Sequence, residues 1–177
     1  MEAKQNALLL ALLKAMDERG SWCGETHVQK ACYFLQEATK VPLDLDFILY
    51  KHGPYSFDLH EDLGDMRARL LVDIEQRPPY GPSLKQGRSA QVLTEGYSDF
   101  ITAYRPAIEF VASKLSGQGV VDLERLATAL YVIRNYQNEA DKAQVMNDLK
   151  PRISKEKATE ALDEVERILE QARGLSG

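Results

Sequence analysis

The segment over residues 47–56 constrains the fold more than any other part of the chain. An apolar stretch at residues 46–51 predicts a strand, and Gly53 and Pro54 follow it. We expect these two residues to end the strand in a turn, because proline has no N–H to extend a ladder and glycine adopts turn conformations freely. Ser56 then precedes an acidic run and suits a helix N-cap. The segment predicts strand, turn and helix in succession, with Gly53, Pro54 and Ser56 as its structural motif.

Helices are predicted before this segment. Over residues 3–19, apolar residues at i, i+3, i+4 and i+7 predict a helix central to the core, which Gly20 would end. A second helix is predicted from Thr26 to about residue 39, with Gln29 completing a capping box.

The segment after the Gly-Pro turn predicts a helix over residues 56–69 and then a hairpin. The hairpin would pair residues 70–75 with residues 88–93 across a tip rich in proline and glycine. The next helix would begin at Thr94, and Pro106 should kink it or split it.

The C-terminal part, residues 118–177, is predicted to be helical. Asp122 and Ser154 are its expected N-caps, and the last helix carries an apolar stripe suited to packing on its neighbour. We predict a mainly α (α+β) fold. Residues 1–117 would form a winged-helix-like module with a small β-hairpin wing, and residues 118–177 a helical extension on the same core.

Composition and charge narrow the functional classes. The chain has 177 residues, 22 basic and 27 acidic side chains and a net charge of -5, which disfavours nonspecific binding to nucleic acid. Two cysteines do not make a disulfide framework, no signal peptide is evident, and the longest apolar run is too short to span a bilayer. We expect a cytoplasmic protein that is not bound to a membrane.

Two short motifs carry a family resemblance. Residues 28–33, with Gln29, Lys30 and Tyr33, followed by residues 50–55, which end in Gly-Pro-Tyr, resemble the Panacea (SocA-like) antitoxin domain and the YwgA-like bacterial proteins. Residues 123–131 and 149–155 are also similar to the YwgA-like pattern. His52 stands where the family usually has an aromatic residue. The resemblance implies a compact helical domain that neutralises a toxin by direct contact, and it implies no catalytic residues.

The exposed turns favour a non-enzymatic protein-binding module, antitoxin-like, whose partner would be a protein such as a toxin encoded nearby. Aromatic and proline residues in turns supply interface area at low entropic cost, and an acidic helix face steers a basic partner. The predicted partner-binding residues are Tyr55, Asp58, Glu61, Asp62 and Tyr80. A homodimer through the last helix stays open.

The alternative is a winged-helix DNA-binding regulator. Its recognition helix would be residues 56–69, whose N-terminal turns are acidic and would repel phosphate. The predicted nucleic-acid contacts are Lys30, Arg77, Lys85 and Arg88.

Neither catalysis nor metal binding is predicted. The three histidines, His27, His52 and His60, form no recognised ligand pattern with the nearby carboxylates and cysteines. No nucleophile elbow, phosphate-binding glycine loop or catalytic triad order is present. We therefore expect no cofactor.

Overall fold

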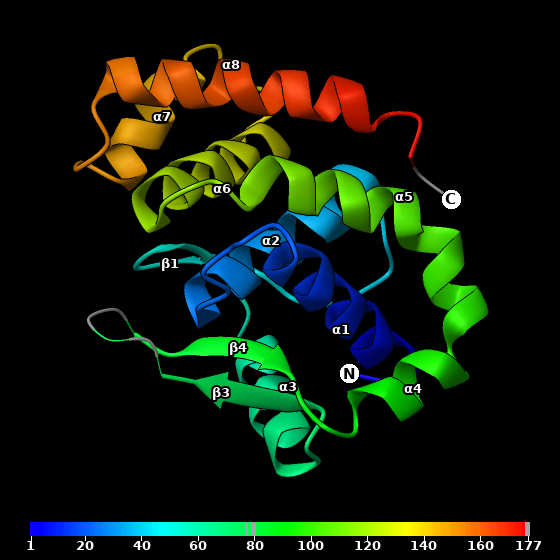
Figure 1. The fold of residues 1–177 in the computed structure, drawn as a ribbon. Helices are drawn as coiled ribbons and strands as arrows, with labels where there is room; N and C mark the ends of the chain where they lie inside the picture. The colour runs from blue at the N-terminus through cyan, green and yellow to red at the C-terminus, as the bar shows by residue number, and fades with distance from the viewer. Residues whose placement is uncertain (77, 79–80, 176–177) are drawn as a thin grey trace.

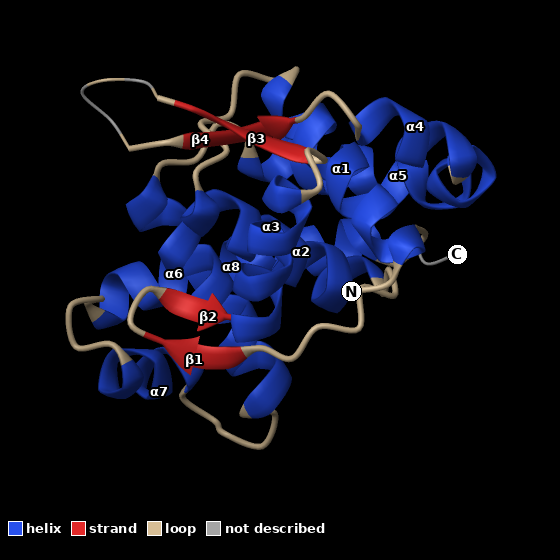
Figure 2. Cartoon of the chain, turned by 90° about the horizontal axis from the view of Figure 1, so that it is seen from below, coloured by secondary structure: helices blue, strands red, loops and turns tan. Residues whose placement is uncertain are grey.

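The computed structural model describes residues 1–76, 78 and 81–175, and within these ranges the chain is mainly helical with two small antiparallel hairpins (Figures 1 and 2). The helices are α1 (Ala3–Asp17), α2 (Glu25–Thr39), α3 (Phe57–Ala68), α4 (Ala90–Gly96), α5 (Ser98–Leu115), α6 (Val120–Asn135), α7 (Lys142–Leu149) and α8 (Lys155–Ala172). The strands are β1 (Ile48–Tyr50), β2 (Gly53–Tyr55), β3 (Val72–Glu75) and β4 (Ser83–Gln86). Figure 1 shows α8 at one side of the molecule, the β3–β4 hairpin and α3 at the opposite side, and α6, α5, α2 and α1 between them.

Helix α1 lies at the centre of the core, as its apolar spacing predicts. It contacts α2, α4, α5 and β4, so apolar residues around most of its circumference are buried. The consecutive leucines Leu8, Leu9 and Leu10 are fully buried. Gly20, at a φ of 74°, lies in the turn that follows the helix.

The Gly-Pro turn predicted at residues 53–54 is wrong, because these residues form a returning strand. β1 and β2 pair antiparallel with Tyr50 opposite Gly53 and Leu49 opposite Pro54, so the turn is Lys51-His52. The turn therefore lies two residues earlier than predicted, and Gly53 follows it with a φ of 86°, which glycine tolerates.

Helix α3 begins where the sequence predicts. The side chain of Ser56 accepts a hydrogen bond from the backbone N–H of Leu59, as expected of an N-cap. The capping box predicted at Thr26 is wrong, since α2 begins at Glu25 after Gly24, and Gln29 binds elsewhere.

The second hairpin is confirmed, but its returning strand is wrong. β3 pairs with β4, with Val72 opposite Gln86, whereas residues 90–96 form α4. The close approach of Gly87 to Leu70 explains the early end of the strand. A Cβ atom at Gly87 would lie 2.3 Å from the carbonyl oxygen of Leu70, so the chain can pass there only as glycine.

Pro106, predicted to kink or split its helix, does not split it, and the break between helices lies at Tyr97, between α4 and α5. Pro106 lies inside α5 on an exposed turn, and Figure 1 shows α5 changing direction along its length. A solvent-facing proline allows this, because water can bind the carbonyl that its missing N–H leaves free.

The C-terminal helices complete the core. α6 packs on α2 and β2, and α8 packs on α6 and α7, so the apolar stripe of α8 is buried within the chain. Ser154 caps α8 as predicted, but Asp122 does not cap α6, which begins at Val120 after Gly119. None of the helices in the described ranges combines the length and apolar character that crossing a membrane requires.

Candidate functional site

The two sequence motifs of the family resemblance touch each other in the structure. On α2, the side chain of Gln29 donates to the carbonyl oxygen of Ser56 and accepts from the Ser56 N–H, both at 2.9 Å. The adjacent Lys30 donates its Nζ hydrogen to the carbonyl oxygen of Pro54 at 2.9 Å. Lys30 is only 1% exposed, and burial lowers its pKa to about 8. The motifs therefore form a structural joint that fixes the β1–β2 hairpin on α2.

A second set of contacts holds the turn of the same hairpin. Lys150, between α7 and α8, donates to the carbonyl oxygens of Tyr50 and Lys51. Arg152 donates to the carbonyl oxygen of Lys51 at 2.6 Å and also binds the carboxylate of Glu124 on α6. The hairpin backbone is thus held by cationic side chains from the opposite ends of the sequence.

Glu124 is the acidic centre of this arrangement. Its side chain is 9% exposed, and its second oxygen lies 3.5 Å from His52 Nδ1. Its negative charge opposes the burial-driven fall in the pKa of Lys30 and of Lys150, both of which nonetheless lie below their ordinary values. A single buried carboxylate therefore sits among four basic groups on the β1–β2 side of α6.

Three aromatic side chains lie against one another, Tyr50 and Tyr55 of the β1–β2 hairpin and Phe57 at the start of α3; we call them the hairpin aromatic patch. The ring centroids lie 5.7 Å apart for Tyr50 and Tyr55, 5.6 Å for Tyr50 and Phe57, and 5.1 Å for Tyr55 and Phe57. Tyr50 is 53% exposed and Phe57 51%. The neighbouring Ile48 is also exposed, so the patch presents apolar surface to solvent.

A polar pair borders the patch. His60 Nδ1 lies 2.7 Å from Glu25, and the Tyr55 hydroxyl donates to the same carboxylate at 3.2 Å. Partial burial and the negative charge of Glu25 raise the pKa of Tyr55 to about 12. Tyr55 is therefore a neutral, oriented member of the patch.

The acidic residues predicted on α3 divide into two groups. Asp58 and Glu61 are exposed, on the helix that begins at the patch. Asp62 instead accepts from the α-amino group of Met1 at 2.6 Å and is 18% exposed. The structure therefore places Asp58 and Glu61 on the surface and gives Asp62 an internal ion pair.

Three of the predicted nucleic-acid contacts lie within the described residues, and their environments differ. Lys30 is buried beneath the hairpin, away from the surface that a nucleic acid would contact. Lys85 pairs with Glu75 at 2.6 Å and lies 4.0 Å from Asp17, while Arg88 is exposed. Arg77 and the predicted partner-binding Tyr80 lie outside the described residues.

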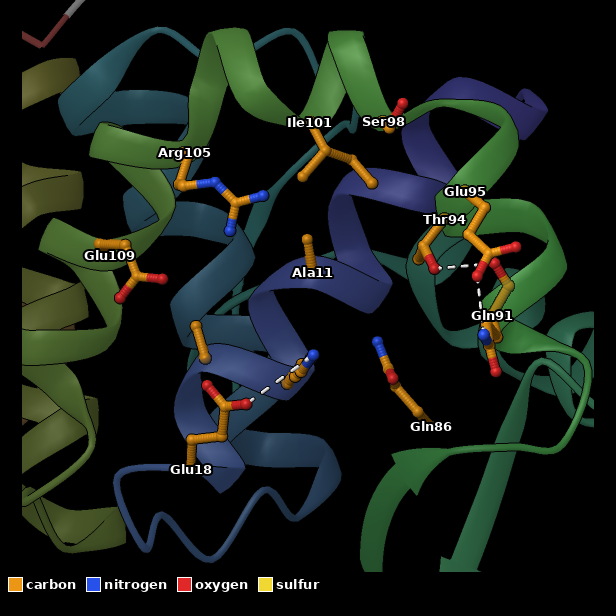
Figure 3. Close-up of a pocket in the computed structure, with 12 residues that line it drawn as sticks. Ala11, Glu18, Gln86, Gln91, Thr94, Glu95, Ser98, Ile101, Arg105 and Glu109 are labelled. Carbon is orange, nitrogen blue, oxygen red and sulfur yellow. Dashed lines mark hydrogen bonds and ion pairs between the residues drawn. The ribbon is translucent and has the colours of Figure 1, made fainter.

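A large surface hollow lies elsewhere, between α1 and the α4–α5 pair (Figure 3). Its volume is about 640 Å³, and small side chains of α1, Ala11 and Ala15, form part of its lining. Charged and amide side chains contribute much of the remainder, including Glu18, Gln86, Glu95, Arg105 and Glu109. Its charged lining residues are three carboxylates, Glu18, Glu95 and Glu109, and two basic side chains, Lys14 and Arg105, so groups of both signs face it.

Among the residues that the structure describes, no three histidine, cysteine or acidic side chains come together in a way that could hold a metal ion. Cys23 and Cys32 are both buried, and burial raises the pKa of the Cys32 thiol. Cys32 therefore behaves as a small apolar core residue.

Comparison with known proteins adds no relative. No protein-family model matches the chain, and no curated protein is significantly similar to it.

Sequence reasoning missed several residues that build the site. Glu124 and Arg152 lie 28 positions apart and meet only through the packing of α8 on α6. The sequence did contain a signal for the role of Gln29. Gln29 and Gln36 lie on the same face of α2, and the side chain of Gln36 likewise forms hydrogen bonds with the backbone of Leu45. An amide side chain repeated at a heptad spacing on a helix whose other residues are mostly buried indicates a buried polar role.

Proposed function

We propose that this chain is a non-enzymatic protein-binding module that acts on its partner by direct contact, in the manner of an antitoxin. The observation that carries the proposal is the hairpin aromatic patch, in which the rings of Tyr50 and Phe57 are about half exposed. The backbone of the hairpin is fixed by contacts from Gln29, Lys30, Lys150 and Arg152. Aromatic side chains are enriched at protein interfaces, and a fixed backbone has little ordering entropy left to lose.

The surroundings of the patch favour a basic partner. Asp58 and Glu61 are exposed on α3, which starts from the patch residue Phe57. Carboxylates at the rim of an apolar patch attract a basic surface before contact and keep acidic surfaces away. Association should therefore slow as salt is added.

The resemblance to Panacea antitoxin domains points the same way, since it rests on the residues that build the hairpin joint. We also propose that α1–α3 and the β3–β4 hairpin form a winged-helix-like module, on the basis of the order of these elements along the chain. In this proposal the module serves as a scaffold for the patch.

The test is a tagged pull-down from the native host with nuclease, comparing the wild type with a Tyr50→Ala/Phe57→Ala variant. Val92→Ala on α4 is the matched control, because Val92 is an exposed apolar residue on another element. We expect a near-stoichiometric protein that survives nuclease and is retained by the control but lost from the double variant. Retention of that protein by the double variant would overturn the role of the patch.

The acidic rim is tested separately with Asp58→Lys/Glu61→Lys. We expect a slower association rate with the captured partner and a weaker dependence of that rate on salt. Unchanged association kinetics would show that the rim does not steer the partner.

A second candidate function, DNA binding, is favoured by one observation. Arg67 and Arg88 line a surface hollow of about 690 Å³ at the C-terminal end of α3, and neither forms an ion pair within the described part of the chain. Unpaired arginines can bind phosphates. A mobility-shift assay with DNA from the chain's own promoter tests this function, with Arg88→Glu expected to abolish a shift that the wild type shows.

A further inference from the structure

The strand β1 has one paired edge and one open edge. β2 pairs with β1 and also packs on α2 and α6, whereas β1 packs chiefly on β2 (Figure 2). Ile48 and Tyr50 of β1 are exposed, and Leu49 between them is partly buried. We call the side of β1 that faces away from β2 the β1 edge.

The backbone groups of Leu49 point out of the β1 edge. Leu49 lies opposite Pro54, and proline has no N–H, so these two residues cannot exchange the pair of hydrogen bonds that alternate positions of an antiparallel ladder form. The carbonyl oxygen of Pro54 instead accepts from Lys30, on the other side of the hairpin. The N–H and C=O of Leu49 therefore face away from β2, and neither has a hydrogen-bond partner within the described residues.

An open edge of this kind selects an extended backbone as its occupant. The outward N–H and C=O of one strand residue are matched by the same two groups of a residue on a further strand, which is how extended peptides add to a sheet edge. The sequence of β1, Ile-Leu-Tyr, contains neither a proline nor a charged residue that would hinder such an addition. The edge is also preorganised, because side chains from α2 and from the segment between α7 and α8 hold carbonyl oxygens of the hairpin.

The exposed side chains of β1 determine what an added strand would carry. Ile48 lies directly opposite Tyr55, and the ring of Tyr50 contacts that of Tyr55, so the exposed face of β1 is continuous with the hairpin aromatic patch. Because side chains alternate between the two faces of a strand, every second side chain of an added strand would lie beside Ile48 and Tyr50. Apolar residues at these alternate positions would extend the patch.

The unpaired charges around the hairpin favour basic residues at the other positions. Asp46 before β1 and Asp58 and Glu61 on α3 are exposed, and none of the three forms an ion pair within the described part of the chain. Lys51 is the exposed cation of the turn, while the cations between α7 and α8 already bind hairpin carbonyl oxygens. Three carboxylates against one ammonium attract a basic segment and repel an acidic one.

We propose that the β1 edge binds an extended, basic segment of the partner as an added antiparallel strand, with apolar side chains at alternate positions beside Ile48 and Tyr50. The residue opposite Leu49 would donate its N–H to the Leu49 carbonyl oxygen and accept from the Leu49 N–H. This inference rests on the proposed function, because it names the conformation and the charge of the segment that engages the hairpin aromatic patch.

The test uses the full, isotopically labelled chain and a capped hexapeptide of alternating lysine and valine. The amide signal of Leu49 is followed by NMR as the peptide is added. We expect a saturable shift of this signal, with a dissociation constant of about 1 mM or lower. A hexapeptide with glutamate in place of lysine should bind much more weakly, because it meets the unpaired carboxylates.

Two methylated hexapeptides test the backbone pairing without any change to the protein. An added strand presents the N–H of every second residue to β1. When the valines of an antiparallel strand lie beside Ile48 and Tyr50, the N–H groups of the lysines face β1 and those of the valines face solvent. We expect backbone N-methylation of the lysines to weaken binding by about tenfold or more, and N-methylation of the valines to leave it nearly unchanged.

Leu49→Pro tests the same edge from the side of the protein. Proline removes the outward N–H, and the ladder bonds of Ile48 and Tyr50 with β2 do not involve that group. The thermal midpoint checks that the variant folds. We expect Leu49→Pro to lose both the lysine–valine hexapeptide and the protein captured in the pull-down.

Four results would overturn the proposal. They are the absence of a saturable shift at Leu49, equal binding of the glutamate and lysine peptides, binding of the lysine-methylated peptide as strong as that of the valine-methylated one, and a dimer of the chain in sedimentation that Leu49→Pro dissociates. The last would assign the β1 edge to a second copy of the chain.

The pull-down separates this proposal from the proposed function. A protein that Leu49→Pro retains and Tyr50→Ala/Phe57→Ala loses would leave the proposed function in place and overturn only the added strand. A protein that the aromatic variant retains would overturn the role of the patch itself, whatever the hexapeptides show.

Discussion

Gln29 exchanges two hydrogen bonds with the backbone of Ser56, one in each direction and each 2.9 Å long. This places the N-cap of α3 in direct contact with the middle of α2, 27 residues earlier in the chain. Gln36, two turns further along α2, makes the same pair of bonds with Leu45. The two glutamines hold both ends of the segment that carries β1 and β2.

Replacing these glutamines should have unequal effects. Gln29→Ala leaves the buried Ser56 N–H without its acceptor, and we expect a loss of about 2–3 kcal/mol in the free energy of unfolding. Gln36 is only partly buried, so water can replace it and Gln36→Ala should cost about 1 kcal/mol. Urea denaturation measures both values, and equal losses would contradict the role of burial.

Replacement by alanine should lower the stability of the fold at one glycine and raise it at another. Gly53 has a φ of 86°, and a Cβ atom there would lie 3.2 Å from Oγ1 of Thr128, so Gly53→Ala should destabilise the fold by about 2 kcal/mol. Gly64 lies inside α3 with open space around it, so Gly64→Ala should stabilise by about 0.5–1 kcal/mol. The thermal midpoints of the two variants should lie on either side of that of the wild type.

The contribution of Lys30 to stability should depend on pH. Its pKa is about 8 in the folded chain against an ordinary 10.5, so the unfolded state binds more protons between these values. The stability contributed by the group is therefore complete above the unfolded pKa and is lost as the pH falls through the folded pKa. Below pH 8 the ammonium is charged in both states, and its full burial cost remains.

Comparison of the wild type with Lys30→Met isolates this contribution. Between about pH 7 and about pH 9.5, the difference in the free energy of unfolding should move in favour of the wild type by about 1–2 kcal/mol. A difference that stays constant over this range would show that Lys30 keeps its ordinary pKa in the fold.

Removing only one partner of the Arg152–Glu124 ion pair should destabilise the fold. Arg152→Ala removes the main partner of a carboxylate that is 9% exposed, and we expect a loss of about 2–3 kcal/mol and faster amide exchange in β1 and β2. The double variant Arg152→Ala/Glu124→Gln should recover part of the stability, because the unpaired buried charge is gone. If the two changes were strictly additive, the pair would not be coupled.

The local sequence determined some of the helices and two of their caps. The spacing of leucines predicted α1, Ser56 and Ser154 predicted the starts of α3 and α8, and the apolar stripe predicted the buried face of α8. These features depend on side chains within a few residues of one another, so a pattern along the chain is enough to predict them.

Tertiary structure alone decided the hairpin and the site. Gly53 and Pro54 suggested a turn, but the turn lies at Lys51-His52 because Lys30 binds the carbonyl oxygen of Pro54 and Lys150 binds that of Lys51. These contacts join residues 24 and 99 positions apart. The Pro54 carbonyl is buried and therefore needs a donor from within the protein. The donor that supplies it is selected by how the helices pack, which no local pattern in the sequence records.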